Sequence, residues 1–328
     1  MLEQLHNHAE SIQQKLRGKR IGILYAAMED TNSIVLKTRT DILTILNSLA
    51  LEVTDIPYDQ NEEVKALHDV INGINSVDLV CKIVHGQLNR SGLFQSLCEA
   101  LKKPYSGHDL KTDLLSQNKI TVKGRMDENN ILTPKYTKII PDKPQELEVF
   151  IKETRAKKFV LKPAETNSSI GILFAEDQKT LKEMASSLPV SYGDYLVEEY
   201  IPGRIITIGV IPLSDNKVYT TPPLEYILES GKPIMDHNWK LHPNRVSPAK
   251  IPNSINKKAT EWAKCLHSAV GARGITRSDF IITQDGEVFA LEINTNVGLA
   301  KNNDVPTAFI ASGGNYEDIV LANLGTAL

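Results

Sequence analysis

The segment between Arg277 and Asn294 constrains the fold more than any other part of the chain. Two apolar runs flank Asp285-Gly286, a dipeptide typical of a two-residue type I′ hairpin turn. Such a turn fixes the strand register, and counting outward from it places Asp279 opposite Glu292 and Arg277 opposite Asn294. Because side chains alternate between the two faces of a strand, we expect all four to project from one face of a sheet.

This charged face predicts a metal site. Two carboxylates that face each other on neighbouring strands repel unless a positive charge lies between them. Asp279, Glu292 and Asn294 offer the oxygen ligands that Mg²⁺ prefers. Arg277 stands beside them and suits an anionic oxygen that the metal does not reach. The alternative is a solvated hairpin with incidental charges, but both carboxylates interrupt apolar runs, which favours the site.

The rest of the chain predicts an α/β protein in which strands and helices alternate. Residues 20–25 are an apolar run that suits a buried parallel strand, and residues 33–50 carry apolar side chains at helical spacing. We expect an N-terminal parallel-sheet α/β domain, a small central α+β domain and a C-terminal α+β domain, over residues 1–108, 109–197 and 198–328. Further helices are expected over 119–130, 254–270 and 306–325.

Composition excludes several classes of protein. The 37 Lys and Arg residues against 40 Asp and Glu residues give a net charge of −3, without the basic excess of a nucleic-acid binder. No apolar run is long enough to span a membrane, and the first twenty or so residues lack the apolar core of a secretory signal. The three cysteines have no metal-binding spacing. We therefore expect a cytoplasmic protein that binds neither nucleic acid nor membrane.

A polar loop after a predicted strand is a candidate phosphate lid. The apolar strand ends at Lys162-Pro163, and the residues from Glu165 to Gly171 are small and polar. Backbone N–H groups and hydroxyls of this kind can cradle phosphate, although the Walker pattern is absent and a plain surface turn is the alternative. Lys162 beside the loop is interpreted as a phosphate contact rather than a snorkelling side chain.

Together these segments resemble the D-alanine–D-alanine ligase family of ATP-grasp enzymes over nearly the whole chain. The matching stretches are, in order, His85-Gly86, Pro104-Tyr-Ser-Gly107, Asn118-Lys119, Lys162-Pro163, Ser168-Ser-Ile-Gly171, Val197-Glu-Glu199, Gly203-Arg204, Pro222 to Glu225, Asp236 to Lys240, Ser247-Pro-Ala249, Arg277-Ser-Asp279 and Glu292 to Gly298. The resemblance implies an ATP-grasp fold and an amide-forming ligase that works through an acyl phosphate. It also implies ATP, two Mg²⁺ ions (with Mn²⁺ as an alternative), small amino-acid-like substrates and a homodimer.

The resemblance assigns roles by position. ATP phosphates are expected at Lys119, Lys162 and Lys240, and the adenine and ribose pocket at Glu198, Glu199, Tyr200 and Ile201. The metal ligands are Asp279, Glu292 and Asn294, the last of which also borders the nucleotide. The reacting centre is expected at Arg277 and the Gly298 backbone, with Ser168 on the lid loop. The amino-acid substrates are expected at His85, Arg90, Asn303 and Asp304.

Some of these positions depart from the family pattern. Arg90-Ser91 reverses the charge of an acidic pair, and Asn303 stands where a serine holds the second substrate's carboxylate. Asp304 replaces an apolar residue, and this pair would repel a free substrate carboxylate near Asp304. We therefore expect a ligase whose substrates are not simply two D-alanines. The alternatives are a conventional D-alanine–D-alanine ligase of peptidoglycan synthesis, a ligase acting on a carrier-protein thiol, and a non-catalytic nucleotide-binding regulator, against which the intact metal ligands argue.

Overall fold

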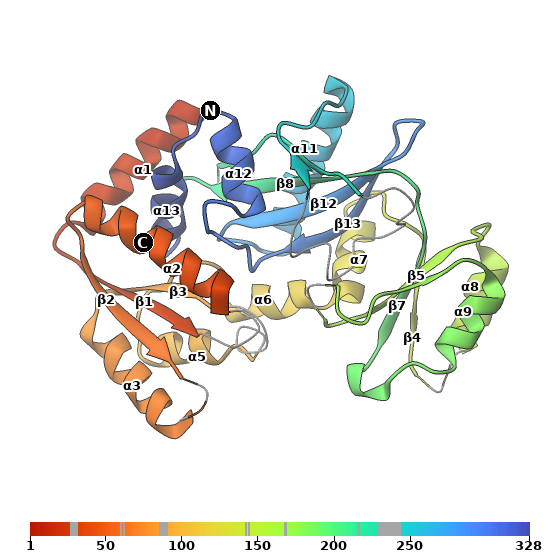
Figure 1. Cartoon of the computed structure of the whole chain (residues 1–328), viewed down its shortest axis with the longest axis horizontal. Helices are drawn as coiled ribbons and strands as arrows, with labels where there is room; N and C mark the ends of the chain where they lie inside the picture. The colour runs from red at the N-terminus through yellow and green to blue at the C-terminus, as the bar shows by residue number, and fades with distance from the viewer. Residues whose placement is uncertain are drawn as a thin grey trace.

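The chain forms three separate β-sheets surrounded by helices (Figure 1). The computed structural model describes residues 1–26, 32–59, 61, 63–84, 91–141, 143, 145–166, 169–214, 217–228 and 244–328. In Figure 1 the first sheet lies at the lower left, the third at the upper centre and the second at the right.

The first sheet is parallel, with β1 between two neighbours, as the apolar run at 20–25 predicts. Two glycines allow the helix over residues 63–76 to pack closely on this sheet, with the Ile56 side chain against both. A Cβ at Gly22 would lie 2.5 Å from that side chain, and a Cβ at Gly73 would lie 2.9 Å from it. The strands in sheet order are β2 (Glu52–Tyr58), β1 (Arg20–Ala26) and β3 (Leu79–Ile83). The helices are α1 (Leu2–Leu16), α2 (Asn32–Ser48), α3 (Glu63–Ser76) and α5 (Leu93–Ala100).

The second sheet is antiparallel and has its own apolar core, which includes Phe159, Leu161 and Val197. The predicted boundary at residue 197 falls inside β7, so the sheet extends two residues beyond it. The strands in sheet order are β4 (Tyr136–Ile139), β7 (Tyr195–Glu199), β5 (Phe159–Pro163) and β6 (Leu173–Ala175). The helices are α8 (Gln145–Glu153), α9 (Gln178–Ala185) and the 3₁₀ turn η2 (Val190–Tyr192).

The third sheet is antiparallel and contains the predicted hairpin. Its main path runs through β11 (Arg245–Val246), β10 (Leu224–Tyr226), β8 (Arg204–Pro212), β12 (Thr276–Ile282) and β13 (Val288–Asn294), and β9 (Val218–Thr220) pairs with β8. The helices that follow in the chain are α11 (Asn253–Ala269), α12 (Asp304–Ala311) and α13 (Tyr316–Gly325).

Two helices assigned by the predicted boundaries to the central domain pack on the third sheet instead. They are α6 (Leu110–Gln117) and α7 (Lys119–Glu128), and in Figure 1 they lie between the first and second sheets. Val122 and Met126 of α7 share one apolar core with Ile208 of β8 and Phe280 of β12. Their burial against this sheet, and not their position in the chain, decides where these helices belong.

The single helix predicted over 306–325 is wrong. The structure has two helices there, α12 and α13, separated by a turn. Gly313 has φ +88°, which an L-residue rarely adopts, and a Cβ at Gly314 would lie 2.3 Å from the ring of Phe309. The side chain of Asn315 then caps α13 by accepting from the Glu317 N–H.

Two remaining expectations from composition can be compared with the described residues. The three cysteines are free thiols, and burial raises the pKa of Cys81 and Cys98 to about 12. None of the helices in the described part of the chain is long and apolar enough to cross a membrane.

Candidate active site

The hairpin has the predicted pairing of carboxylates but not the predicted turn. A three-residue loop replaces the two-residue type I′ turn: the Gly286 N–H donates to the Thr283 carbonyl, and the Thr283 N–H donates to the Glu287 carbonyl. This shifts the register by one residue near the turn. A β-bulge then restores it, so that Phe280 pairs with Ala290 whereas Asp279 pairs with Glu292 and Arg277 with Asn294, as predicted.

The charged side chains of the hairpin share one face, and Arg277 lies between the carboxylates. Its guanidinium binds Asp279 through two hydrogen bonds, Nε to Oδ1 and Nη2 to Oδ2, each 2.9 Å long. Its Nη2 is 3.9 Å from Oε1 of Glu292, to which the Asn294 amide donates at 3.3 Å. Thr207 on β8 also donates to Asp279 at 2.6 Å. Burial raises the pKa of Asp279 against the opposing pull of Arg277.

Asp304, at the first residue of α12, holds the other side of Arg277. Its Oδ2 accepts from Arg277 Nη1 at 3.1 Å and from the Tyr226 hydroxyl at 2.7 Å, and its Oδ1 accepts from Arg245 Nη1 at 2.6 Å. These partners keep the pKa of Asp304 below its ordinary value in spite of burial, with Arg277 the strongest of them. The charge of Asp304 is therefore compensated by two guanidinium groups of the protein itself.

A second buried charge cluster lies on the second sheet. Glu198 of β7 forms ion pairs with Lys162 of β5 and with Lys123 of α7, whose Nζ is 3.0 Å from Oε2. The side chain of Lys123 is 1% exposed and that of Glu198 3%. Burial lowers the pKa of Lys123, whereas Glu198 opposes this shift. Sequence reasoning missed Lys123, although it follows Lys119 by four residues on a helix and so belongs to the same face.

The other predicted nucleotide residues surround this cluster. Lys119 begins α7 and donates from Nζ to the carbonyls of Pro163, at 3.1 Å, and Thr166, which ties the helix to the polar loop. Glu199 accepts from the Thr154 hydroxyl, and the Tyr200 ring meets Phe174 edge-on at 5.0 Å. The side chain of Ile201 is partly buried against an apolar cluster of the third sheet.

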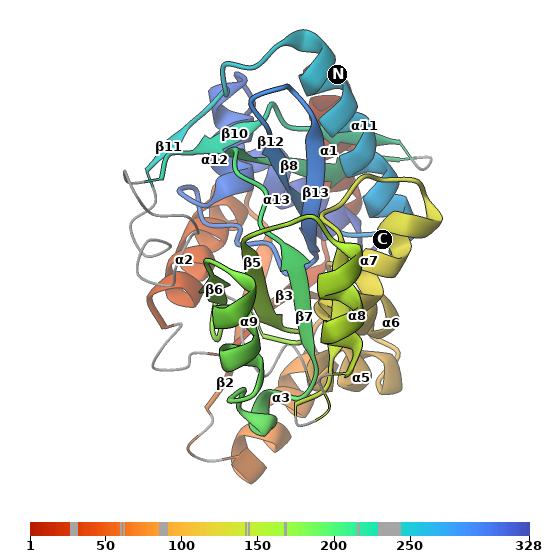
Figure 2. The ribbon, with the colours of Figure 1, turned by 90° about the vertical axis from the view of Figure 1, so that its right-hand side faces the viewer.

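The hairpin face and the lysine cluster are neighbours. The Lys123 ammonium donates to the Thr133 hydroxyl, which in turn donates to the Ala290 carbonyl of β13 at 2.7 Å. The negative charge of Glu292 acts directly on the pKa of Lys123. Figure 2 looks onto the second sheet, with the hairpin strands β12 and β13 above β5 and β7. The lysine cluster of the second sheet and the carboxylates of the hairpin therefore meet at one junction between the two sheets.

The donor set on the hairpin fits a hard divalent cation. Asp279 and Glu292 supply carboxylate oxygens and Asn294 an amide oxygen, which is the ligand chemistry of Mg²⁺ and Mn²⁺. Arg277 already places a positive group between the carboxylates, so the site is built for positive charge. Among the described residues no group of three or more His, Cys, Asp and Glu side chains is placed to hold a metal ion.

Some of the remaining residues predicted for the site lie in the part of the chain that the structure describes, and others do not. Asn303 precedes Asp304, and its side-chain oxygen accepts from the Ala300 N–H at 2.9 Å. A Cβ at Gly298 would lie 2.7 Å from that oxygen, so the two residues form one tight turn. Four predicted residues lie outside the residues that the structure describes: His85, Arg90, Ser168 and Lys240.

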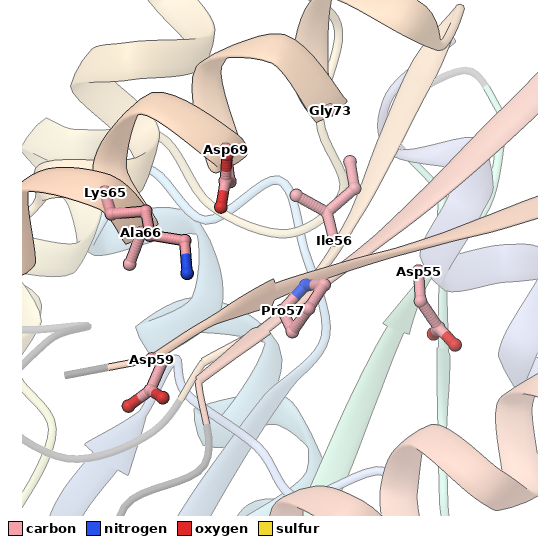
Figure 3. A pocket seen from close by; sticks show the side chains of 8 residues that line it. All are labelled: Asp55, Ile56, Pro57, Asp59, Lys65, Ala66, Asp69 and Gly73. Carbon is pink, nitrogen blue, oxygen red and sulfur yellow. The ribbon is translucent and has the colours of Figure 1, made fainter. Parts of the chain in front are cut away.

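A separate hollow of about 360 Å³ lies between β2 and α3 (Figure 3). Figure 3 shows Lys65 and Asp69 on the helix, opposite Ile56 and Pro57 on the strand. Asp55 on its rim is held by Arg39 through two hydrogen bonds. None of the residues predicted for the nucleotide, the metal or the amino acids lines this hollow.

Solved structures with the same architecture identify the class of fold. The chain matches the crystal structure of VanG D-Ala:D-Ser ligase from Enterococcus faecalis with a TM-score of 0.80 and 20% identity, covering 95% of this chain and 100% of that one. It matches D-alanine–D-alanine ligase from Bacillus anthracis complexed with ATP with a TM-score of 0.76 and 19% identity, covering 94% and 97%. The fold is therefore that of an ATP-grasp ligase, as expected.

Sequence comparison then identifies the family. The family model for the D-ala D-ala ligase C-terminus matches residues 126–324. D-alanine–D-alanine ligase from Fusobacterium nucleatum is 26% identical over 309 residues, covering 94% of this chain and 99% of the relative. The enzyme of the same name from Streptococcus pyogenes is 30% identical over 249 residues, covering 74% and 70%. The chain belongs to the D-alanine–D-alanine ligase family, whose members are ATP-dependent ligases.

Proposed function

We propose that the protein joins two amino acids in an ATP- and Mg²⁺-dependent reaction that passes through an acyl phosphate. The observation that carries the proposal is the pairing of Asp279 with Glu292 across the hairpin, with Arg277 between them, next to the lysines of the second sheet. Phosphorylation of one substrate carboxylate makes its oxygen a leaving group, and the amine of the second substrate then attacks the acyl carbon. Phosphate leaves as the amide bond forms.

Each residue group has a proposed role in this reaction. Lys119, Lys162 and Lys240 bind ATP phosphates, and the segment from Glu198 to Ile201 lines the adenine and ribose pocket. Asp279, Glu292 and Asn294 would hold two Mg²⁺ ions, or Mn²⁺ in their place, which would supply positive charge against the transferred phosphoryl group. Arg277 and the Gly298 backbone hold the oxygens of the tetrahedral centre. Ser168, on the proposed lid loop, is assigned to the same reacting centre.

We further propose that the substrates are not simply two D-alanines. Asn303 and Asp304 stand where the family has a serine and an apolar residue, and both side chains are already engaged within the protein, on Ala300 and Arg245. His85 and Arg90 belong to the same substrate region of the proposal. The division into domains at about 108 and 197, the cytoplasmic location and the homodimer remain predictions.

The test is product identification from purified protein. ATP and Mg²⁺ are supplied with D-alanine paired with other D- and L-amino acids, ADP release is followed, and the dipeptide is identified by mass spectrometry. The expected result is Mg²⁺-dependent ADP release with a mixed dipeptide as the main product. Asp279→Asn removes the activity, whereas Asp285→Asn, the same change at an exposed residue of the same hairpin, does not.

Other outcomes identify other functions. D-alanyl-D-alanine as the main product would identify a conventional ligase of peptidoglycan synthesis. Thermal stabilisation by Mg-ATP without ADP formation under any pairing would refute the enzyme and favour a nucleotide-binding regulator.

A further inference from the structure

Arg277 and a divalent cation compete for the same carboxylate. Both oxygens of Asp279 accept hydrogen bonds from Arg277, and Oδ1 also accepts from Thr207. A cation bound by Asp279 and Glu292 would face the guanidinium at close range, where the two positive charges repel strongly. Cation binding at Asp279 therefore favours release of the Nε and Nη2 edge of Arg277 from this carboxylate.

Asp304 gives that guanidinium a second anchor. It binds Nη1 of Arg277, the one nitrogen of the fork that does not touch Asp279. Asp304 is itself fixed by Tyr226 and Arg245 and by its place in the first turn of α12, where the helix dipole stabilises a negative charge. Arg245 is fixed in turn, because its Nη2 donates to the Asn302 carbonyl at 2.8 Å.

We propose that Asp304 is a positioning residue that keeps hold of Arg277 when a divalent cation displaces it from Asp279. The guanidinium then pivots on its Nη1 bond to Asp304, and its Nε and Nη2 edge turns toward the oxyanion of the tetrahedral centre. Metal binding at Asp279 and the orientation of the Arg277 guanidinium are thereby coupled, with Asp304 as the pivot. The inference rests on the proposed function for the oxyanion, but the competition for Asp279 depends only on the contacts described above.

Removing Asp304 should therefore weaken metal binding through Arg277. In Asp304→Asn the guanidinium has lost its alternative anion, so it remains on Asp279 and resists the cation. We expect the Mn²⁺ dissociation constant, measured without nucleotide from the electron paramagnetic resonance signal of free Mn²⁺, to rise about fivefold or more. Turnover should fall at least about tenfold while the KM for ATP stays within about twofold, because the misplaced group acts on the transition state.

A double-mutant cycle with Arg277→Met separates this mechanism from a simple loss of negative charge. If Asp304 acts through Arg277, Asp304→Asn should change Mn²⁺ affinity by less than about twofold in the Arg277→Met background. An equal loss of affinity in both backgrounds would show direct electrostatics and overturn the proposal. Unchanged Mn²⁺ affinity of Asp304→Asn in the wild-type background would overturn it as well.

Asp318→Asn is the matched control. Asp318 is also a buried aspartate in the first turn of a helix, but it lies in α13 and binds His6 of α1. It should leave Mn²⁺ affinity and turnover unchanged, and circular dichroism confirms that each variant is folded. The Mn²⁺ measurements need no amino-acid substrate. The coupling between Asp304 and Arg277 can therefore fail in a protein that forms the amide bond, and it can hold in a protein that does not.

Discussion

Lys123 is expected to be a structural cation whose loss destabilises the protein without removing nucleotide binding. Its ammonium lies 3.0 Å from Glu198, and both side chains are at most 3% exposed. Removing one member of a buried ion pair costs about 3–5 kcal/mol, because the remaining charge is left uncompensated. Glu198 keeps Lys162 as a partner, so we expect Lys123→Met to lower the free energy of unfolding by about 3 kcal/mol, at the low end of that range.

Lys162 offers the matched comparison. It pairs with the same carboxylate, but its side chain is 12% exposed and it borders the polar loop. We expect Lys162→Met to cost less stability, about 1–2 kcal/mol, because water reaches this side of the pair. It should weaken ATP binding more than Lys123→Met does, since of these two lysines only Lys162 is proposed to contact phosphate.

The assay is urea denaturation of each variant together with ATP titration by calorimetry. The triple variant Lys123→Met/Lys162→Met/Glu198→Gln removes all three charges of the cluster and should recover most of the lost stability. A loss below about 1 kcal/mol in Lys123→Met would refute the reasoning, because the pair would then contribute no more than a surface ion pair. No recovery in the triple variant would show that packing, and not charge, explains the loss.

Three further outcomes follow from single residues. Burial lowers the pKa of His267 to about 4, so its contribution to stability is complete above about pH 6.5. As the pH falls toward 4, about 3 kcal/mol of the free energy of unfolding is lost. His267→Gln should reduce this pH dependence, whereas His68→Gln, at an exposed histidine, should not. Gly298→Ala should displace Asn303 and lower turnover about tenfold with less than about 1 kcal/mol lost in urea denaturation, and unchanged kinetics would contradict the tight turn. Gly203→Ala should destabilise the protein by more than about 1–2 kcal/mol in the same assay, because its Cβ would lie 2.4 Å from a backbone carbonyl of β12, and a neutral result would contradict that contact.

The charge clusters share one physical arrangement. Glu198 is compensated by Lys123 and Lys162, and Asp279 is compensated by Arg277, which Asp304 also holds. In both clusters a cation proposed to act on a ligand is bound to a carboxylate of the protein itself. These buried carboxylates each have a positive partner, which avoids the large cost of an isolated buried charge.

Local patterns in the sequence determined the strands and the register of the hairpin carboxylates. An apolar run at 20–25 is sufficient to predict a buried parallel strand, and a count outward from Asp285-Gly286 predicts that Asp279 and Glu292 face each other, as they do. The predicted turn type is wrong, and an unpredicted bulge compensates for it. Bulges depend on how a strand packs against its neighbours, which a two-strand count does not include.

Only the tertiary structure decided which residues far apart in the sequence form ion pairs. Lys123 is 75 residues from Glu198 and Asp304 is 27 residues from Arg277, so no local period joins either pair. The sequence by itself determined the family, the fold and the presence of the charged hairpin, because these depend on motifs and on short-range periodicity. The state of each charge was decided by folding, because the strength of an ion pair depends on distance and burial, and both exist only after the sheets have come together.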